Sequence, residues 1–262
     1  QIKVMHIEAG LRSGDMYAPF PEEINRKIAG SVTFAHMAPT ERAGKNLQQE
    51  GYSENIFITG NTVIDALLLG LDILEKEPEK IDPGQYGSLD LKKQFVLITG
   101  HRRESFGQSF EHICEAIREL SEKYPELEFI YPVHLNPNVR EPVNRILANV
   151  DRVHLVEPLD YPHLIWLMKH CHLVLTDSGG IQEEAPALGK PVLVMRDVTE
   201  RQEGVEAGTA ILVGTDKNKI ITEVSRLLDD PTHYRSMSQA TNPYGDGHAS
   251  THIANHLHKL LS

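Results

Sequence analysis

Short apolar runs alternate with longer amphipathic stretches along most of the chain. A short apolar run bounded by turn residues is typical of a buried strand, whereas apolar positions three and four residues apart indicate a helix. Regular alternation of the two patterns predicts an α/β fold that is built on mainly parallel sheets. The expected strands are at 3–7, 33–38, 55–59, 95–99, 128–133, 153–156, 172–176, 191–195 and 210–213.

Helix-start signals stand in front of several amphipathic stretches. Pro21 suits a first helical turn, and Glu22 and Glu23 lie near the positive end of the same helix dipole. Thr40 has the side chain of an N-cap, which accepts a hydrogen bond from a free amide of the first turn. The expected helices are at 21–29, 40–50, 61–75, 109–123, 142–149, 161–170 and 180–188, with three more from about Lys217, Pro231 and Ala249.

The stretch 76–93 differs from both patterns, because prolines and glycines lie among many charges, as is typical of an interdomain linker. Six predicted strands follow it, enough for a doubly wound domain, but only three precede it. We therefore expect the C-terminal part of a Rossmann-like domain at 1–75 and a second Rossmann-like domain at 94–245. A terminal helix at 246–262 is expected to cross back to the first lobe. Because the chain begins in a strand-like run without an initiator Met, the rest of the incomplete N-terminal domain is expected before Gln1.

Composition and charge narrow the classes of function. The 262 residues carry 26 basic and 37 acidic side chains, a net charge of -11, which argues against a general nucleic-acid surface. No apolar run reaches the roughly 18 residues of a membrane-spanning helix, so no membrane partner is expected. Cys114 and Cys171 lie in apolar helical patterns, which suits buried thiols in a reducing cytoplasm better than a disulfide framework.

The strongest chemical signal is a Ser-Gly-Gly turn between a buried strand and a helix. The first amides of a helix have no partner inside the helix, and the helix dipole adds to them, so they bind anions. Gly179 and Gly180 let phosphate oxygens approach the backbone, and the Ser178 hydroxyl adds a donor. Glu184, one turn into the helix, offers a carboxylate to both hydroxyls of a ribose. The alternative is an ordinary turn in which Ser178 only caps the helix.

A second polar turn, 100–107, follows the strand at 95–99. It lies at the carboxyl end of that strand, which is where doubly wound domains bind ligands. His101, Arg102 and Arg103 together suit a diphosphate, because arginine offers forked donors and histidine donates or exchanges a proton. The alternative is a solvated basic turn, and the presence of two such turns in one domain favours the ligand site.

Carboxylates gather in the first part of the chain. Glu8 closes the strand at 3–7, and Glu22 stands at a helix start. Two carboxylates that face one site act as acid and base when their surroundings separate their pKa values. The alternative for Glu22 and Glu23 is the ordinary stabilisation of a helix dipole.

Two further side chains lie at strand ends on the edge where we expect the ligand. His134 follows the strand at 128–133, where hydrogen bonding within its loop is the default role. Arg201 follows the strand at 191–195, from which it reaches a sugar or a phosphate. The sequence shows no metal signature.

Taken in order, these motifs resemble bacterial-type non-hydrolysing UDP-N-acetylglucosamine 2-epimerases. The resemblance spans almost the whole chain, and the combination is far more specific than any single motif. It implies two Rossmann-like domains that face a cleft, as in the glycosyltransferase B fold, and a homodimer that needs no cofactor. The matching segments are 6–12, 19–26, 60–66, 100–107, 131–139, 176–192 and 242–247.

The resemblance also implies roles for individual residues. Glu8 and Glu22 look like the family's catalytic carboxylates, and His101 lies beside the phosphates. Arg102 and His134 are similar to residues that line a second, regulatory UDP-N-acetylglucosamine site in the bacterial enzymes. The residues that resemble those in contact with the UDP moiety or the rest of the ligand are Ser178, Gly179, Gly180, Glu184, His101 and Arg201.

The implied reaction is reversible epimerisation at C2 of UDP-N-acetylglucosamine, giving UDP-N-acetylmannosamine. The C2 hydrogen is not next to a carbonyl, so the route runs by elimination of UDP to 2-acetamidoglucal and addition of UDP after protonation of the other face. Three alternatives remain open from the sequence: a UDP-sugar glycosyltransferase of the same fold, a hydrolysing relative that releases UDP, and a non-catalytic nucleotide-sugar binding fragment.

Overall fold

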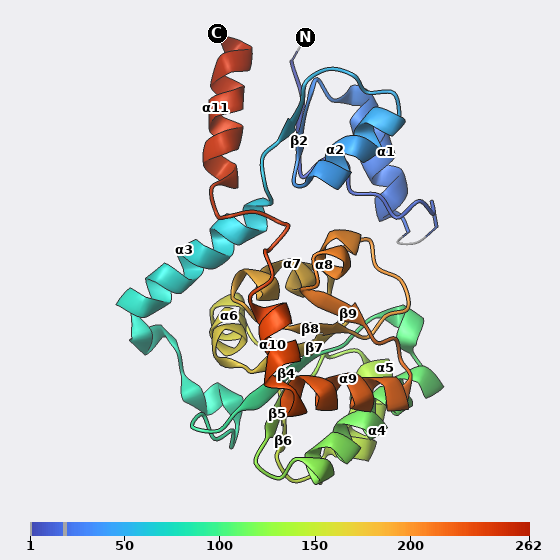
Figure 1. The fold of residues 1–262 in the computed structure, drawn as a ribbon, viewed down its shortest axis with the longest axis vertical. Coiled ribbons are helices and arrows are strands. Elements are labelled where there is room, and N and C mark those ends of the chain that lie inside the picture. Colours follow the sequence, from blue (N-terminus) through green and yellow to red (C-terminus); the bar gives the residue numbers. More distant parts are fainter. Residues whose placement is uncertain (1, 18–19) are drawn as a thin grey trace. The chain divides into compact units, whose positions relative to one another are not determined.

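The computed structural model describes residues 2–17 and 20–262 (Figure 1). Pro19, which opens the second acidic motif, lies outside the described residues. The fold is mixed α/β with two parallel, Rossmann-like sheets, as the alternation predicts, and it is of the glycosyltransferase B-like class that the family resemblance implies. The chain forms two compact units, one of Gln1–Leu69 with Asn242–Ser262 and one of Gly70–Thr241. We call them unit 1 and unit 2.

Unit 1 contains a three-stranded parallel sheet in the order β1-β2-β3. The Thr40 hydroxyl caps α2 by accepting a hydrogen bond of 3.1 Å from the Ala43 amide, as its position before an amphipathic stretch predicts. The strands are β1 (Met5–Ile7), β2 (Ala35–Ala38) and β3 (Ile56–Ile58), and the helices between and after them are α1 (Glu22–Val32), α2 (Glu41–Gln49) and α3 (Thr62–Lys76).

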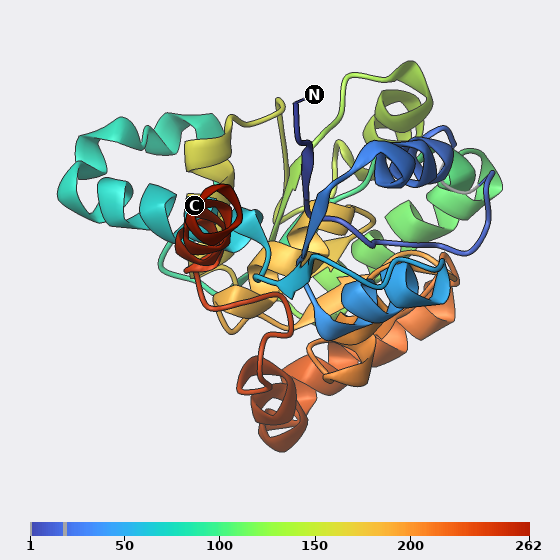
Figure 2. The same ribbon diagram turned by 90° about the horizontal axis from the view of Figure 1, so that it is seen from above.

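The last helix of the chain, α11 (Ala249–Leu261), packs in unit 1. Its Ile253 joins Ala35 and Met37 of β2 in one apolar cluster. The Asp65 carboxylate of α3 caps its start by accepting hydrogen bonds from the amides of Ala249 and Ser250, at 3.0 and 2.7 Å. Figures 1 and 2 both show α11 beside the start of α3. Residues far apart in the sequence therefore complete this unit together.

Unit 2 contains a six-stranded parallel sheet in the order β6-β5-β4-β7-β8-β9. Strand order reverses between β4 and β7, which makes their carboxyl ends a topological switch point. The strands are β4 (Phe95–Thr99), β5 (Glu128–Pro132), β6 (Val153–Val156), β7 (Leu173–Thr176), β8 (Val192–Val194) and β9 (Ala210–Leu212). The helices are α4 (Gln108–Lys123), α5 (Pro137–Leu147), α6 (Tyr161–His170), α7 (Gly179–Ala187), α8 (Gln202–Glu206), α9 (Lys217–Asp229) and α10 (Pro231–Ser238).

Helices cover both faces of the unit 2 sheet. Successive residues of a strand point to opposite faces, so each strand contributes to two apolar clusters. In β4, Val96 and Ile98 join a cluster with α4, α5 and α9, whereas Leu97 packs with α6 and α7 on the other face. Figure 1 shows these two groups of helices on either side of the sheet. A strand buried on both faces has no polar alternation, which explains why it appears in the sequence as a continuous apolar run.

Three parts of unit 2 differ from the sequence expectation. The helix expected at 142–149 begins at Pro137 and ends at Leu147, because Asn136 caps it through a hydrogen bond of 3.0 Å from the Asn138 amide. The stretch 76–93, expected as a linker, lies in unit 2. Its Tyr86 is buried and stacks on Trp166, with the ring centroids 5.4 Å apart. A short helix, α8, was not expected at all.

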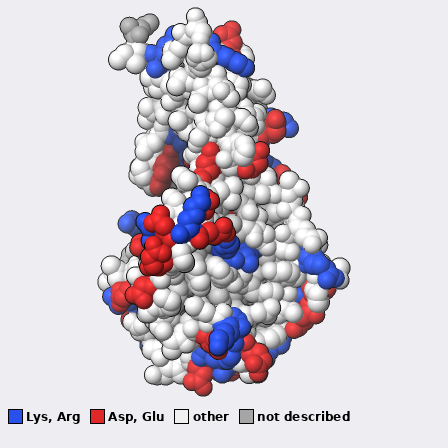
Figure 3. Space-filling model, turned by 90° about the vertical axis from the view of Figure 1, so that its left-hand side faces the viewer, with Lys and Arg blue, Asp and Glu red and all other residues white. Residues whose placement is uncertain are grey.

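The charges on the face in Figure 3 are mixed rather than gathered. On the face in Figure 3, acidic and basic side chains of the described residues lie together in small groups, with no extended basic field. Within 2–17 and 20–262, none of the helices combines the length and the apolar character that crossing a bilayer requires.

Candidate functional site

The Ser-Gly-Gly turn joins β7 to α7 at the switch point of unit 2. The Ser178 amide donates 2.9 Å to the Thr176 hydroxyl, which lies 2.6 Å from the Thr99 hydroxyl on β4. Ser178 is the N-cap residue of α7, but its side chain makes no capping hydrogen bond. Among the hydrogen bonds of the described residues, none uses the amides of Gly179 or Gly180. The turn therefore presents free donors at the positive end of a helix.

The second turn is held against the first by a buried carboxylate, Asp177. Its Oδ2 accepts hydrogen bonds from the amides of His101 and Arg102 at 2.7 and 2.8 Å. Its Oδ1 lies 3.4 Å from Nδ1 of His101, and the residue is only 1% exposed. The Tyr131 hydroxyl also holds this turn, because it donates a hydrogen bond of 2.8 Å to the Gly100 carbonyl. Asp177 was not among the site residues expected from the sequence, although a carboxylate directly after a buried strand was the available signal.

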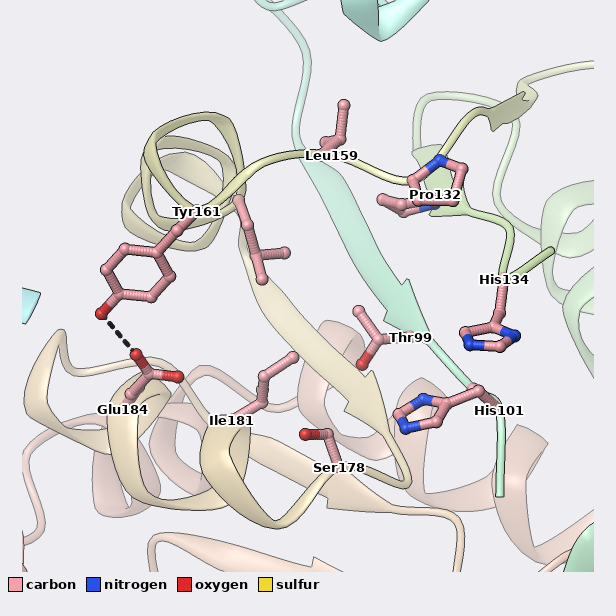
Figure 4. A pocket seen from close by; sticks show the side chains of 12 residues that line it. Thr99, His101, Pro132, His134, Leu159, Tyr161, Ser178, Ile181 and Glu184 are labelled. Carbon is pink, nitrogen blue, oxygen red and sulfur yellow. Dashed lines mark hydrogen bonds between the residues drawn. The ribbon is translucent and has the colours of Figure 1, made fainter. Parts of the chain in front are cut away.

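A pocket of about 360 Å³ opens between these turns and the start of α6 (Figure 4). Its polar side chains include His101, His134, Ser178 and Glu184, while Pro132, Leu159 and Ile181 are among its apolar ones. A concave, mainly apolar space with a few converging polar groups is the usual form of a small-ligand site.

The two histidines of the pocket stack on each other, with ring centroids 5.4 Å apart and planes 18° from parallel. Nδ1 of His134 accepts a hydrogen bond of 3.1 Å from the Asn136 amide. A neutral His134 therefore carries its proton on Nε2. His134 thus has a loop hydrogen bond, as the default expectation had it, and also lines the pocket beside His101.

Glu184 lies at the other end of the pocket, inside α7. Its Oε1 accepts a hydrogen bond of 2.6 Å from the Tyr161 hydroxyl (Figure 4). Burial raises the pKa of Glu184 above its usual value, and the nearby charge of Glu183 adds to that shift. Hydrogen bonds from ligand hydroxyls would satisfy the rest of this carboxylate.

Arg201 lies against the glycine turn rather than in the pocket lining. A Cβ on Gly179 would come within 2.8 Å of its Cζ, so the guanidinium lies directly beside that backbone. The guanidinium also pairs with Glu183, at 2.9 Å, and with Glu200. Burial opposes ionisation of Glu200, but Arg201 and Arg196 outweigh it, so the pKa of Glu200 lies below its usual value. The guanidinium beside the turn is therefore part of an ion-pair network with two carboxylates. Arg102 is not among the residues that line the pocket, and its Nε is buried with no hydrogen-bond partner among the described residues.

The two carboxylates of unit 1 lie in different surroundings. Glu8 follows β1 with a positive φ of 61°, and its Oε1 accepts a hydrogen bond of 2.6 Å from the Thr62 hydroxyl. Glu22 is exposed at the first position of α1. Its neighbour Glu23 is buried and accepts hydrogen bonds from the amides of Ser13 and Gly14, at 3.2 and 3.4 Å. Glu23 therefore has a structural role, and Glu22 is left accessible.

Two histidines beside Glu8 make unit 1 sensitive to acid. His6 and His36 are opposite each other on β1 and β2, and Nδ1 of each is buried with no hydrogen-bond partner among the described residues. Burial lowers the pKa of both below 6.5, and the positive charge of Arg12 lowers both further. The folded unit therefore favours the neutral rings.

We expect unit 1 to lose stability as the pH falls. Because the folded pKa values are depressed, the unfolded chain binds more protons below about pH 6.5, so the stabilisation is present above that pH and is lost below it. The melting temperature of unit 1 should be lower at pH 5.5 than at pH 7.5, and His36→Phe should reduce that difference. The exposed His258 of α11 supplies the control His258→Gln. Equal pH dependence in the two variants would contradict this account.

The architecture defines a class of protein. A parallel, doubly wound sheet with two donor-rich turns at the carboxyl ends of its two central strands is the arrangement of α/β proteins that bind anionic ligands at a switch point. The chain belongs to the UDP-N-acetylglucosamine 2-epimerase family, whose sequence model matches residues 1–258.

Individual relatives agree with this assignment. The UDP-N-acetylglucosamine 2-epimerase of Yersinia pestis is 56% identical over 256 residues, which cover 97% of this chain and 68% of the relative. The crystal structure of the Neisseria meningitidis UDP-GlcNAc 2-epimerase bound to UDP-GlcNAc matches with a TM-score of 0.93 and 46% identity, over 98% of this chain and 70% of that one. The Methanocaldococcus jannaschii enzyme in complex with UDP-GlcNAc and UDP matches with a TM-score of 0.82 and 36% identity, over 98% and 69%.

Proposed function

We propose that the protein catalyses the reversible C2 epimerisation of UDP-N-acetylglucosamine to UDP-N-acetylmannosamine. The observation that carries this proposal is the pocket of unit 2, where free amides at the start of α7 adjoin the turn of His101. The names of the relatives supply the reaction class, and two of the matching structures hold UDP-GlcNAc.

We place the diphosphate of UDP on the donors of the Ser178-Gly179-Gly180 turn, with the ribose at Glu184. The position of Arg201 beside Gly179 supports this placement, because a guanidinium is the side-chain group that best matches phosphate oxygens. The apolar side chains at the far side of the pocket suit a uracil ring. Arg102 and His134 are assigned to ligand binding as well, either of substrate or of a regulatory second molecule.

The chemistry proceeds by elimination and addition. A base removes the C2 proton while the bond between C1 and the diphosphate oxygen breaks, which leaves 2-acetamidoglucal and UDP. An acid then protonates the opposite face of C2, and UDP adds back to C1. We assign the two proton transfers to Glu8 and Glu22, and the departing diphosphate to His101 and the glycine turn. The hydrogen bond from Thr62 to Glu8 and the exposure of Glu22 show that the two carboxylates have different surroundings.

The route is redox-neutral, so we assign no nicotinamide cofactor to it. A homodimer is proposed from the family resemblance. A cytoplasmic location is supported by Cys114 and Cys171, which are buried thiols without a disulfide.

Proton NMR of the reaction in deuterated water tests the proposal, with protein expressed from its complete gene. We expect UDP-N-acetylmannosamine to appear and deuterium to enter C2 of both sugar nucleotides. Release of free N-acetylmannosamine with UDP would instead identify a hydrolysing enzyme. Absence of both exchange and epimer would reject the epimerase assignment.

A further inference from the structure

One hydrogen bond of the pocket acts on the side chain that we assign to the ribose of UDP. Tyr161, the first residue of α6, donates a hydrogen bond of 2.6 Å from its hydroxyl to Oε1 of Glu184 on α7 (Figure 4). Both side chains line the pocket. The contact joins two helices of unit 2 at the end of the pocket away from His101 and His134.

The contact gives the carboxylate a defined orientation. With Oε1 on Tyr161, Oε2 faces the glycine turn, since a Cβ on Gly180 would lie 3.7 Å from Oε2. An ionised carboxylate accepts up to about four hydrogen bonds. Tyr161 uses one of them, which leaves acceptor positions on both oxygens beside the turn that we assign to the diphosphate.

The contact also acts on the charge of Glu184, which is only 5% exposed. Burial raises the pKa of Glu184, whereas the hydrogen bond from Tyr161 works in the opposite direction. An ionised carboxylate accepts hydrogen bonds at both oxygens, and hydrogen bonds to charged groups are the stronger ones. The phenol therefore favours the form of Glu184 that recognises two neighbouring hydroxyls.

We propose that Tyr161 is a positioning residue that holds Glu184 ready for the 2′ and 3′ hydroxyls of a ribose, and so makes the pocket selective for ribonucleotides over 2′-deoxyribonucleotides. The inference rests on the proposed function, because it takes Glu184 as the ribose ligand. Tyr161 acts through Glu184 and is not assigned a direct contact with the reacting sugar.

Calorimetry with UDP and 2′-deoxy-UDP tests the inference. The unchanged protein should bind UDP at least about 10-fold more tightly, because 2′-deoxy-UDP leaves one acceptor of a buried carboxylate unused. Tyr161→Phe should weaken UDP about 10-fold and 2′-deoxy-UDP much less, so that the preference nearly disappears. In turnover, KM for UDP-N-acetylglucosamine should rise while kcat stays within about 2-fold.

Tyr124→Phe is a matched control, because the Tyr124 hydroxyl donates 2.9 Å to a carboxylate oxygen of Asp229 in the same unit, and neither residue lines this pocket. It should leave both affinities unchanged. In a Glu184→Gln background, adding Tyr161→Phe should change UDP affinity by less than about 2-fold, since the acceptor charge is already gone.

The outcomes separate the two proposals. An unaltered preference in Tyr161→Phe, or no preference in the unchanged protein, overturns the inference and leaves UDP binding intact. Failure of the unchanged protein to bind UDP overturns both. A general loss of folding in Tyr161→Phe would lower the affinity for both nucleotides equally, which also counts against a role in selectivity.

Discussion

Glu8→Gln should lower the turnover of UDP-N-acetylglucosamine by about 10²- to 10⁴-fold, which is the usual contribution of general acid–base catalysis. The substitution is nearly isosteric, and the Gln carbonyl oxygen can still accept the hydrogen bond that Thr62 donates to Oε1. What is lost is the ability to take or give a proton. UDP affinity should stay within about 2-fold, because the UDP donors that we assign lie in unit 2. Steady-state kinetics and calorimetry on the same preparation measure both.

The matched control for this prediction is Glu54→Gln. Glu54 is an exposed carboxylate of unit 1 that is not assigned a role in binding or catalysis, and its replacement should leave kcat unchanged. Deuterium exchange at C2 adds a direct readout, because it requires the proton transfer itself. Exchange at the normal rate in Glu8→Gln would remove Glu8 from the mechanism.

Gly10→Ala should destabilise unit 1 by about 3 kcal/mol or more. Gly10 has a φ of 88°, and a Cβ there would lie 2.1 Å from the Ala43 carbonyl oxygen and 2.7 Å from its carbon. These are backbone atoms of α2, so no side-chain rotation relieves the overlap. Hydrogen exchange of β1 and α2 peptides should speed up accordingly, and turnover should fall with the folded fraction.

Gly51→Ala separates the two causes of that effect. Gly51 also has a positive φ, 93°, but nothing lies within 4 Å of the position that its Cβ would occupy. Gly51→Ala should therefore lower the free energy of unfolding only by the conformational strain, about 1 kcal/mol. Similar losses in the two variants would mean that close approach to α2 contributes little at Gly10.

The parallel strands were predictable because a strand that is buried on both faces appears in the sequence as a continuous apolar run. The boundaries of β4 and β6 match the expected ones, and most others shift by one or two residues. The Ser178 turn was predictable for a related reason, since a strand, two glycines and a helix are adjacent in sequence. The helix at 142–149 was placed wrongly because Pro142 was taken as its start, whereas Asn136 and Pro137 provide the cap and the first turn.

The side chains that organise the pocket were not predictable in the same way. Asp177 holds the amides of His101 and Arg102, which lie 76 and 75 residues away, and Tyr161 reaches Glu184 across 23 residues. No local pattern relates such partners, because the contacts exist only after two strands or two helices have been placed side by side. Glu22 and Glu23 show the same limit, since the sequence alone did not separate the buried neighbour from the exposed one.

The discontinuity of unit 1 sets an order of events during translation. The ribosome finishes Gly70–Thr241 before it adds Asn242–Ser262, so the six-stranded sheet has all its strands while β2 still lacks the cover of Ile253. A premature stop codon near position 242 would therefore spare the later unit and harm the earlier one. The released truncated chain should resist proteases across the middle of the sequence and be cut near its start.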